Sequence, residues 1–259
     1  MVKVYLVSFA TPEFYESQER LNKSVLKLGV DGAFPYTMEM IKKTDFYKEN
    51  KELLDKKQRV GFAVWKPYII SEAMKKINYG DILIYCDSGI SLKSSLNRFI
   101  EICKKEGIVL FESSPVMKQW TKRDCFILMG ADEEKYHNAK QIMGGLNLWK
   151  KTKISEKIVS EWLEFCKDER IIGDMSNQCG YPNYPEFIEH RWDQSVLSIL
   201  AVKYSKHIKR LDDVKDCIWE VHRKRKRGFV RNIIFRIKIR IPTSIKDRVK
   251  WFINHHIRK

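Results

Sequence analysis

The sequence predicts an α/β domain, with a mostly parallel sheet flanked by helices, and a separate basic segment at the C-terminus. Strand-like and helix-like stretches alternate over residues 1–111, as in a doubly wound sheet. The run Asp81–Cys86 is almost wholly apolar, as in a central parallel strand buried on both faces. Residues 223–259 hold 14 Lys and Arg against one acidic residue, so they carry +13 of the formal net charge of +16.

The first strand and the first helix are marked by residue type. Val2–Phe9 is rich in valine and aromatic residues and predicts a buried strand. Thr11 is a suitable N-cap, and Pro12 fits the first position of a helix. We expect this helix to run to Leu28 and to end at Gly29, because glycine is common just after a helix.

The alternation continues to residue 111. Asp45–Lys57 is strongly charged and is expected to be an exposed helix. Pro67 is expected to open a helix that ends at Ile77, with apolar residues on one face. The remaining elements expected in this half are the strand 81–86, a helix over 94–105 and a strand over 108–111.

The second half of the chain is less regular. Its amphipathic stretches and its one segment rich in Gly, Asn and Pro predict alternating helices and loops. The expected elements are a helix over 155–167, an irregular loop over 173–185, a helix over 192–202 and a strand over 207–211.

Several protein classes are disfavoured by the cysteines and the apolar runs. No two of the six cysteines form a C-x-x-C pair, which argues against zinc-ribbon and thioredoxin-type sites, and their scatter favours a reducing compartment. Met1–Phe9 is typical of a strand and not of a signal peptide. No apolar run reaches the about 18 residues of a membrane span. We therefore expect a cytoplasmic protein whose residues 1–222 form one domain.

Residues 223–259 are interpreted as a membrane-associating tail of amphipathic helices. Five basic residues, Arg223–Arg227, precede isoleucines at helical spacing with Lys and Arg between them. Such a segment binds anionic membrane surfaces, and Trp251 suits the headgroup level. Nucleic acid would attract the same charges, but isoleucines rather than base-stacking aromatics separate them. Docking on a partner in a membrane-bound assembly is the third interpretation.

Two polar segments follow predicted strands, where doubly wound sheets bind their ligands. The first contains Ser8, Phe9, Ala10 and Thr11, and the second contains Asp87, Ser88 and Gly89. A carboxylate placed as Asp87 is, directly after a buried strand, is suited to hold a divalent cation that bridges a diphosphate. The alternative is that Asp87 starts a turn or caps the following helix.

A second polar group lies at residues 189–195, where another helix begins. Asp193 and Gln194 fall in its first turn, where side chains and backbone amides are able to bind a sugar or a phosphate. The alternative is that Asp193 is only the N-cap of that helix. Earlier in the chain, Trp65 is interpreted as core packing. Lys66 either reaches a phosphate or covers apolar surface with its stem.

Four stretches, taken in order, resemble one family. They are Trp65–Ile70, Gly80–Gly89, Thr121–Asp124 and His190–Ser195. They resemble bacterial and viral GT-A-type glycosyltransferases, which use nucleotide-diphospho-sugars in the synthesis of capsule, O-antigen or lipopolysaccharide, and similar glycans. The resemblance covers roughly residues 1–212 and does not reach the basic tail.

The resemblance implies a donor site at Asp87. This residue matches the first carboxylate of the family's Asp-x-Asp motif, which binds the nucleotide and Mn²⁺ or Mg²⁺. Gly89 stands in place of the second Asp. Weak metal binding, a further ligand such as His190 or His222, or catalysis without a metal all remain open.

The resemblance also implies roles further along the chain. Asp193 and Gln194 are similar to an Asp-Gln pair that lies against the donor sugar, so Asp193 is the candidate acid/base or sugar-contact residue. Lys122 and Arg123 are implied to neutralise the leaving diphosphate, although each is equally well interpreted as a solvated charge beside Asp124. The other candidate donor-binding residues are Ser8, Phe9, Ala10, Thr11, Lys66, Ser88, Gly89, His190 and Arg191.

The sequence therefore predicts an enzyme, a glycosyltransferase of the hexosyltransferase type, peripheral on the cytoplasmic face of a membrane. Its expected partners are a nucleotide-sugar donor, a cell-surface glycan or lipid-linked acceptor, and an anionic membrane surface, without nucleic acid. One alternative is a non-catalytic binding protein in which the missing second Asp marks a lost donor site. The other alternative is a nucleic-acid-binding protein that acts through its basic tail.

Overall fold

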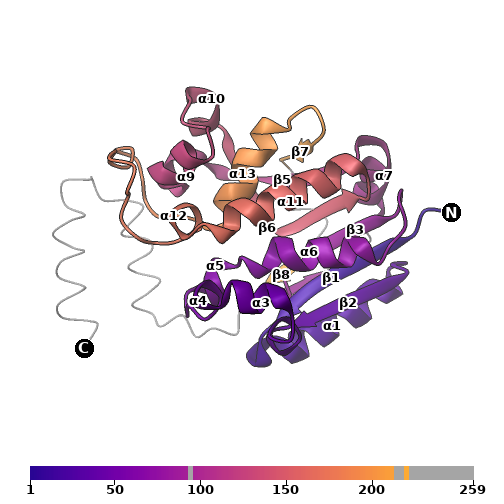
Figure 1. Cartoon of the computed structure of the whole chain (residues 1–259). Coiled ribbons are helices and arrows are strands. Elements are labelled where there is room, and N and C mark those ends of the chain that lie inside the picture. The colour runs from indigo at the N-terminus through magenta and orange to yellow at the C-terminus, as the bar shows by residue number, and fades with distance from the viewer. Residues whose placement is uncertain (93–95, 213–218, 222–259) are drawn as a thin grey trace.

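A six-stranded sheet with helices on both faces forms the body of the protein (Figure 1). The computed structural model describes residues 1–92, 96–212 and 219–221. The strand order in the sheet is β2-β1-β3-β6-β5-β7. The strands are β1 (Val4–Ala10), β2 (Gly32–Thr37), β3 (Ile82–Cys86), β5 (Ile108–Val116), β6 (Lys140–Lys150) and β7 (Lys209–Leu211). A separate pair joins β4 (Ile90–Leu92) to β8 (Trp219–Val221).

The predicted fold class is confirmed, but the sheet is mixed. β1 pairs in parallel with β2 and β3, and β5 pairs in parallel with β7. β6 runs antiparallel between β3 and β5. The strand expected at 81–86 therefore has a parallel neighbour on one side only. β6 was not predicted from the sequence, because Gly144, Gly145 and Asn147 interrupt its apolar pattern.

β2 was also not predicted from the sequence. It contains Pro35, which cannot donate to a neighbouring strand and usually argues against a strand. The structure explains how the proline is tolerated, because β2 is the edge strand and needs a partner on one side only.

The long helices lie close to where the sequence predicted them, but the helix expected to open at Pro67 begins two residues earlier, at Trp65. Pro12–Phe14 forms a 3₁₀ turn that leads into α1 (Tyr15–Lys27), with Thr11 at the N-cap position but without a side-chain capping bond. The other long helices are α6 (Trp65–Lys75), α7 (Asn97–Glu106), α11 (Lys153–Lys167) and α13 (Asp193–Lys203). The short helices are α2 (Met38–Ile41), α3 (Asp45–Glu49), α4 (Lys51–Leu54), α5 (Arg59–Phe62), α8 (Met117–Trp120), α9 (Arg123–Leu128), α10 (Glu134–His137) and α12 (Glu169–Ile172).

The expectation of one exposed helix over Asp45–Lys57 was wrong. The segment forms two short helices, α3 and α4, and three of its apolar side chains are buried. They are Phe46, Leu53 and Leu54. The many charged residues between these three made the segment look exposed in the sequence.

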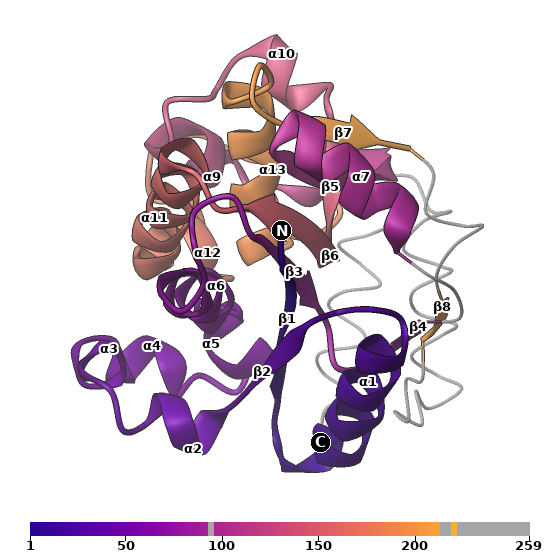
Figure 2. The ribbon, with the colours of Figure 1, turned by 90° about the vertical axis from the view of Figure 1, so that its right-hand side faces the viewer.

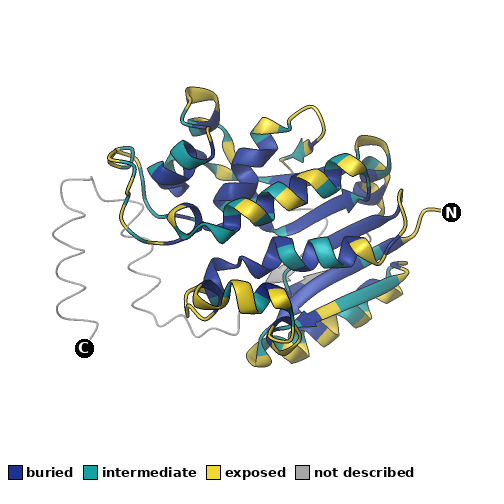
Figure 3. Cartoon of the chain, viewed as in Figure 1, coloured by how far each residue is buried: buried dark blue, intermediate teal, exposed yellow. Residues whose placement is uncertain are grey.

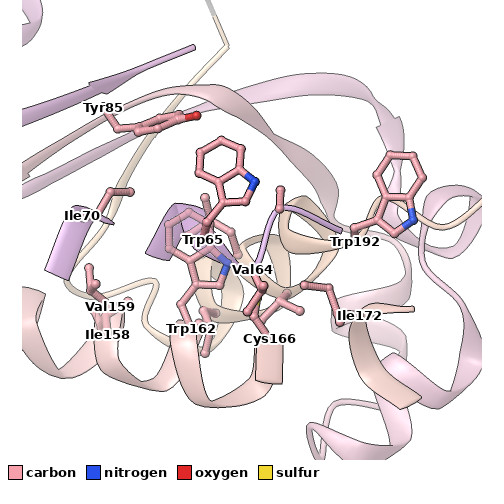
Figure 4. Close-up of a cluster of buried hydrophobic side chains, with 14 of the residues drawn as sticks. Val64, Trp65, Ile70, Tyr85, Ile158, Val159, Trp162, Cys166, Ile172 and Trp192 are labelled. Carbon is pink, nitrogen blue, oxygen red and sulfur yellow. The ribbon is translucent and has the colours of Figure 1, made fainter. Parts of the chain in front are cut away.

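Two clusters of buried hydrophobic side chains pack against the sheet, one on each face. Figure 2 shows α6, α11 and α13 on one face and α1 and α7 on the other, and Figure 3 shows buried strands beneath helices with exposed outer faces. On the first face, Trp65 stacks on Phe9 with ring centroids 3.8 Å apart, which confirms its interpretation as core packing. The same cluster contains Trp162 and Trp192 (Figure 4).

Some predicted features lie outside the described residues. They are the tail at 223–259 and the expected helix start at Ser94. Within the residues that the structure describes, no helix is both long enough and apolar enough to cross a membrane.

The segment labelled α5 is not a right-handed helix: together with Ala63 it forms a left-handed turn that precedes α6. The five residues Arg59–Ala63 all have positive φ, between 50° and 67°, although four of them are not glycine. An L-residue in this conformation costs about 1–2 kcal/mol. At the centre of the turn, a Cβ on Gly61 would lie 2.7 Å from the backbone of Leu53 and of Leu54. The turn is therefore pressed against α4, and only glycine fits at its centre.

Substituting Gly61→Ala is expected to destabilise the protein by about 1–3 kcal/mol more than Gly130→Ala. Both residues have φ above +60°, but nothing lies within 4 Å of a Cβ built on Gly130. The difference between the two variants therefore isolates the clash with α4, which is of the order found for overpacking. Urea unfolding followed by circular dichroism measures both. Equal losses in the two variants would contradict the close packing of this turn.

Candidate functional site

Three charged side chains from distant parts of the chain meet near the carboxyl end of β3. Asp87 directly follows β3, Asp193 is the first residue of α13, and Lys66 is the second residue of α6. The Lys66 Nζ lies 2.8 Å from Asp193 Oδ2 and 3.9 Å from Asp87 Oδ1. It also donates a hydrogen bond of 3.1 Å to the backbone carbonyl of Gly144 in β6.

Burial divides this cluster into an inner pair and an outer carboxylate. The side chains of Lys66 and Asp193 are 7% and 6% exposed, whereas that of Asp87 is 44% exposed. A buried ion pair must offset the loss of solvation of both partners, so removing either one leaves an uncompensated charge. Asp87 is thus the more exposed carboxylate of this cluster, and Lys66 and Asp193 lie deeper.

The local environment shifts the protonation of both buried groups. Burial alone would lower the pKa of Lys66, but the charges of Asp193 and Asp87 outweigh it and raise this pKa above the usual value of lysine. Burial, reinforced by Asp87 and opposed by Lys66, raises the pKa of Asp193. Lys66 is therefore held as a cation, and Asp193 binds a proton more readily than an exposed aspartate does.

Asp87 is held in place by its neighbours. The Tyr85 hydroxyl donates to Asp87 Oδ1 at 2.5 Å, and the backbone amide of Asp87 donates to the Gly145 carbonyl at 2.9 Å. The amide of Ile90 donates to the Asp87 carbonyl, so Asp87 also begins a tight turn, as the alternative interpretation proposed. The turn and the site are compatible, because the turn uses the backbone and leaves the carboxylate free to face solvent.

A glycine pair in β6 forms one wall of the site. A Cβ on Gly144 would lie 3.4 Å from the Lys66 Nζ, and one on Gly145 would lie 3.1 Å from Asp87 Oδ2. Neither glycine was predicted from the sequence to belong to the site. Two adjacent glycines inside a strand are the signal that was available, since such glycines often mark a close approach.

Asp193 is not the N-cap that the alternative interpretation proposed. Trp192 occupies the N-cap position with φ 52°, and Asp193 directs its carboxylate to Lys66. The neighbouring Gln194 donates a hydrogen bond of 3.2 Å to Gln141 in β6. The start of α13 is thereby fixed to β6 and α6 at once.

The candidates near the first strand lie partly inside it. β1 extends to Ala10, so Ser8, Phe9 and Ala10 are buried strand residues and only Thr11 follows the strand. The Ser8 hydroxyl accepts a hydrogen bond from the Gln18 side chain at 3.2 Å. Donor binding by these four residues stays a prediction, as it does for Ser88, which is buried, and for Gly89.

Four further candidates are associated with the loop between α12 and α13. Lys122 is buried and its Nζ donates to the Met175 carbonyl at 3.4 Å, while Arg123 forms an ion pair with Asp132 at 2.8 Å. His190 is buried, and Arg191 pairs with Glu189 at 3.1 Å. Within the described part of the chain, no recorded contact of Lys122, Arg123 or His190 reaches Asp87 or Asp193. Their roles toward a donor stay predictions.

Asp124, to which the sequence analysis gave no role, anchors that loop. Its fully buried carboxylate accepts hydrogen bonds from the backbone amides of Gln178 and Cys179 at 2.6 and 3.1 Å. The loop expected at 173–185 is confirmed as irregular, and Asp124 explains why an irregular segment keeps one conformation there.

A divalent metal ion does not fit the protein groups alone. Among residues 1–92, 96–212 and 219–221, no group of three or more Asp, Glu, His or Cys side chains is placed to hold one. One of the two Asp87 oxygens, Oδ1, already accepts from the Tyr85 hydroxyl and lies 3.9 Å from the Lys66 ammonium. His190 is enclosed elsewhere, and His222 lies outside the described residues. Binding of Mn²⁺ or Mg²⁺ at Asp87 stays a prediction.

No protein-family model and no curated protein matches this sequence. Solved structures of similar fold include a glycosyltransferase involved in the glycosylation of the major capsid of PBCV-1, with 12% identity, a TM-score of 0.46 and coverage of 81% of this chain and 82% of that one. Mouse xyloside xylosyltransferase 1 shows 11% identity, a TM-score of 0.45 and coverage of 82% and 86%. The galactosyltransferase LgtC shows 11% identity and a TM-score of 0.42, with coverage of 80% of this chain and 72% of that one.

Substituting His190→Asn is expected to remove part of the acid sensitivity of the fold. Burial, with the charge of Lys122, lowers the pKa of His190 to about 3, whereas in the unfolded chain it is about 6.5. Stability is therefore lost as pH falls below 6.5, because only the unfolded chain takes up the proton. Between pH 7.5 and pH 5 the wild type should lose about 2 kcal/mol more than the variant.

Urea unfolding at the two pH values measures this difference. His207→Asn, which changes an exposed histidine, is the matched control and should keep the pH dependence of the wild type. If His190→Asn and the wild type lose the same stability, His190 is not held neutral by burial.

Proposed function

We propose that the protein is a glycosyltransferase that moves a sugar from a nucleoside-diphosphate sugar to a hydroxyl group of a cell-surface glycan or lipid-linked acceptor. The observation that carries the proposal is the cluster of Asp87, Lys66 and Asp193 at the carboxyl end of β3. Ligands of α/β sheets bind at these strand ends. The resemblance of Trp65–Ile70 and Gly80–Gly89 to GT-A-type motifs supports glycosyl transfer over other nucleotide chemistry.

The polarity of the site suits a sugar donor. Asp87 offers a solvent-facing carboxylate oxygen to sugar or ribose hydroxyls, and Gly144 and Gly145 put no side chain between it and Asp193. Carboxylates are strong acceptors for hydroxyl donors, so two of them beside a glycine wall favour a polyhydroxylated ligand.

The reaction forms one bond and breaks another at the anomeric carbon. The acceptor hydroxyl oxygen bonds to that carbon, the bond from the carbon to the diphosphate oxygen breaks, and the diphosphate leaves with the electron pair. The hydroxyl proton passes to a carboxylate, for which we propose Asp193. Burial raises the pKa of Asp193, which makes it a stronger base than an exposed aspartate, and Lys66 holds its orientation.

Asp87→Asn and Asp193→Asn are each expected to lower sugar transfer by about 100-fold or more, the range found when general-base or charged contacts are removed. The assay incubates the full-length protein with UDP-, GDP-, CMP- and dTDP-sugars and measures release of the nucleotide, with and without Mn²⁺. Melting-temperature shifts with the same compounds report donor binding. Asp55→Asn, an exposed aspartate on α4's C-terminal side, is the control and should behave as the wild type.

The outcomes separate the functional classes. If no nucleotide or nucleotide sugar shifts the melting temperature at millimolar concentration, the proposal fails. Binding without turnover under every acceptor tested would instead favour the non-catalytic binding protein.

Residues 223–259 are proposed to hold the enzyme at an anionic membrane surface, where lipid-linked acceptors lie. The support is their charge of +13, because each basic residue near such a surface contributes on the order of 1 kcal/mol. Replacing the five basic residues Arg223–Arg227 with Gln in the full-length chain should sharply reduce co-sedimentation with phosphatidylglycerol vesicles. Unchanged co-sedimentation, or tighter binding to RNA than to vesicles at physiological salt, would contradict this proposal.

A further inference from the structure

The left-handed turn at Arg59–Ala63 presents an arginine next to the candidate site. Four of its five residues are non-glycine residues with φ between 50° and 66°. Unfavourable backbone of this kind persists only where the surrounding structure imposes it, and it is concentrated at functional sites.

Packing on one side of the turn imposes this conformation. Phe62 and Ala63 are buried, and the Gly61 amide donates to the Lys56 carbonyl at 2.8 Å. The Val64 amide donates a hydrogen bond of 3.0 Å to the Gly61 carbonyl, directly before α6 begins. The apolar residues are thus turned inward, and Arg59, at the start of the turn, is left exposed.

Arg59 lies against the residue that precedes Asp193. Its guanidinium carbon is 5.1 Å from the ring centroid of Trp192. Trp192 is itself held at φ 52°, is 8% exposed, and donates from Nε1 to Asp174 at 2.7 Å. Two strained segments therefore meet at this contact, and the contact brings Arg59 to the rim of the cluster.

Arg59 acts on Asp193 through its charge, but no carboxylate among the described residues forms an ion pair with it. Among the described residues Arg59 makes its ring contact with Trp192, and no ion pair or hydrogen bond of its side chain is found there. In contrast, Lys66 is enclosed by Asp193 and Asp87. Arg59 is also close enough to act on that pair. Burial raises the pKa of Asp193, and the charges of Lys66 and, more weakly, of Arg59 oppose that rise.

We propose that Arg59 binds the diphosphate of the nucleotide-sugar donor and neutralises the negative charge that grows on it as it leaves. This inference rests on the proposed glycosyltransferase function. A guanidinium that lies over an indole ring still has N–H groups to donate, and its planar fork matches two phosphate oxygens at once. Arg59 is an exposed cation beside Trp192, the residue directly before Asp193.

The position of Arg59 provides positive charge that a metal ion held by a second Asp, absent at Gly89, would otherwise supply. A leaving diphosphate needs positive charge beside it, and the described residues around Asp87 do not form a metal site by themselves. A cation fixed by the backbone, as Arg59 is, needs little reorganisation when the donor binds. The strain of the turn is then linked to function, because it places Arg59 where an ordinary turn would not.

The test measures nucleotide affinity of the full-length protein by isothermal titration calorimetry with UDP, GDP, CDP and dTDP, and with the matching monophosphates. For the diphosphate that binds, Arg59→Gln should weaken the Kd about 10- to 100-fold, the loss of hydrogen bonds to a charged group. The Kd of the monophosphate should change about threefold at most, because the distal phosphate provides the contact. Arg59→Lys should fall between the wild type and Arg59→Gln.

The control is Arg20→Gln, the same change at an exposed arginine on α1, which packs on the opposite face of the sheet. It should leave every Kd unchanged. If the wild type binds a diphosphate and Arg59→Gln binds it equally well, the inference fails and the proposed function stands. Equal weakening of monophosphate and diphosphate, or a lower melting temperature of Arg59→Gln without ligand, would show a structural role and overturn the inference. If the wild type binds no nucleotide at all, the proposed function fails first.

Discussion

Lys66 is a buried cation, and the need to neutralise it determines most of the geometry of the site. Removing an ammonium group from water costs several kcal/mol unless anions and hydrogen bonds replace the solvent. Asp193 supplies the contact at 2.8 Å, Asp87 supplies the second charge, and the Gly144 carbonyl accepts a hydrogen bond. These groups belong to α13, to the end of β3 and to β6. Four elements, with α6 itself, must therefore converge, and a side chain at Gly144 would compete for the same space.

A second layer of polar contacts keeps the surroundings of this cluster in place. Tyr85 holds the carboxylate of Asp87, and Gln194 ties the first turn of α13 to β6. Farther out, the buried carboxylate of Asp124 binds two backbone amides of the loop that leads into α13. These hydrogen bonds restrict the conformation of the long irregular loop. The path of the chain toward Asp193 is therefore determined by hydrogen bonds and not by regular secondary structure.

The sequence indicated the members of the site better than their assembly. Asp87 was predictable because a buried apolar strand precedes it, and Asp193 because it opens a helix within a family-like motif. Their ion pairs with Lys66 were not predictable, since they depend on β6, whose glycines and Asn147 break the pattern of a strand. The turn at Arg59 was hidden for a different reason: positive φ at non-glycine residues is imposed by tertiary packing and leaves no local signal. The fold class followed from local alternation, whereas the site depends on contacts between distant segments.

The two cations near Asp193 differ in what their charge is available for. Lys66 is enclosed, and two carboxylates of the protein neutralise its charge. It therefore positions the side chains of the site more than it attracts a ligand. Arg59 is exposed and lies over the Trp192 ring, so its charge remains accessible from solvent. Exchanging the two roles would fail on physical grounds, since a guanidinium in the tight space beside Gly144 would clash and a flexible lysine at the rim would lose the stacking that orients it. The buried pair therefore needs the small ammonium and the rim needs the planar guanidinium, which is why the fold can hold one cation without strain but requires a left-handed turn to present the other.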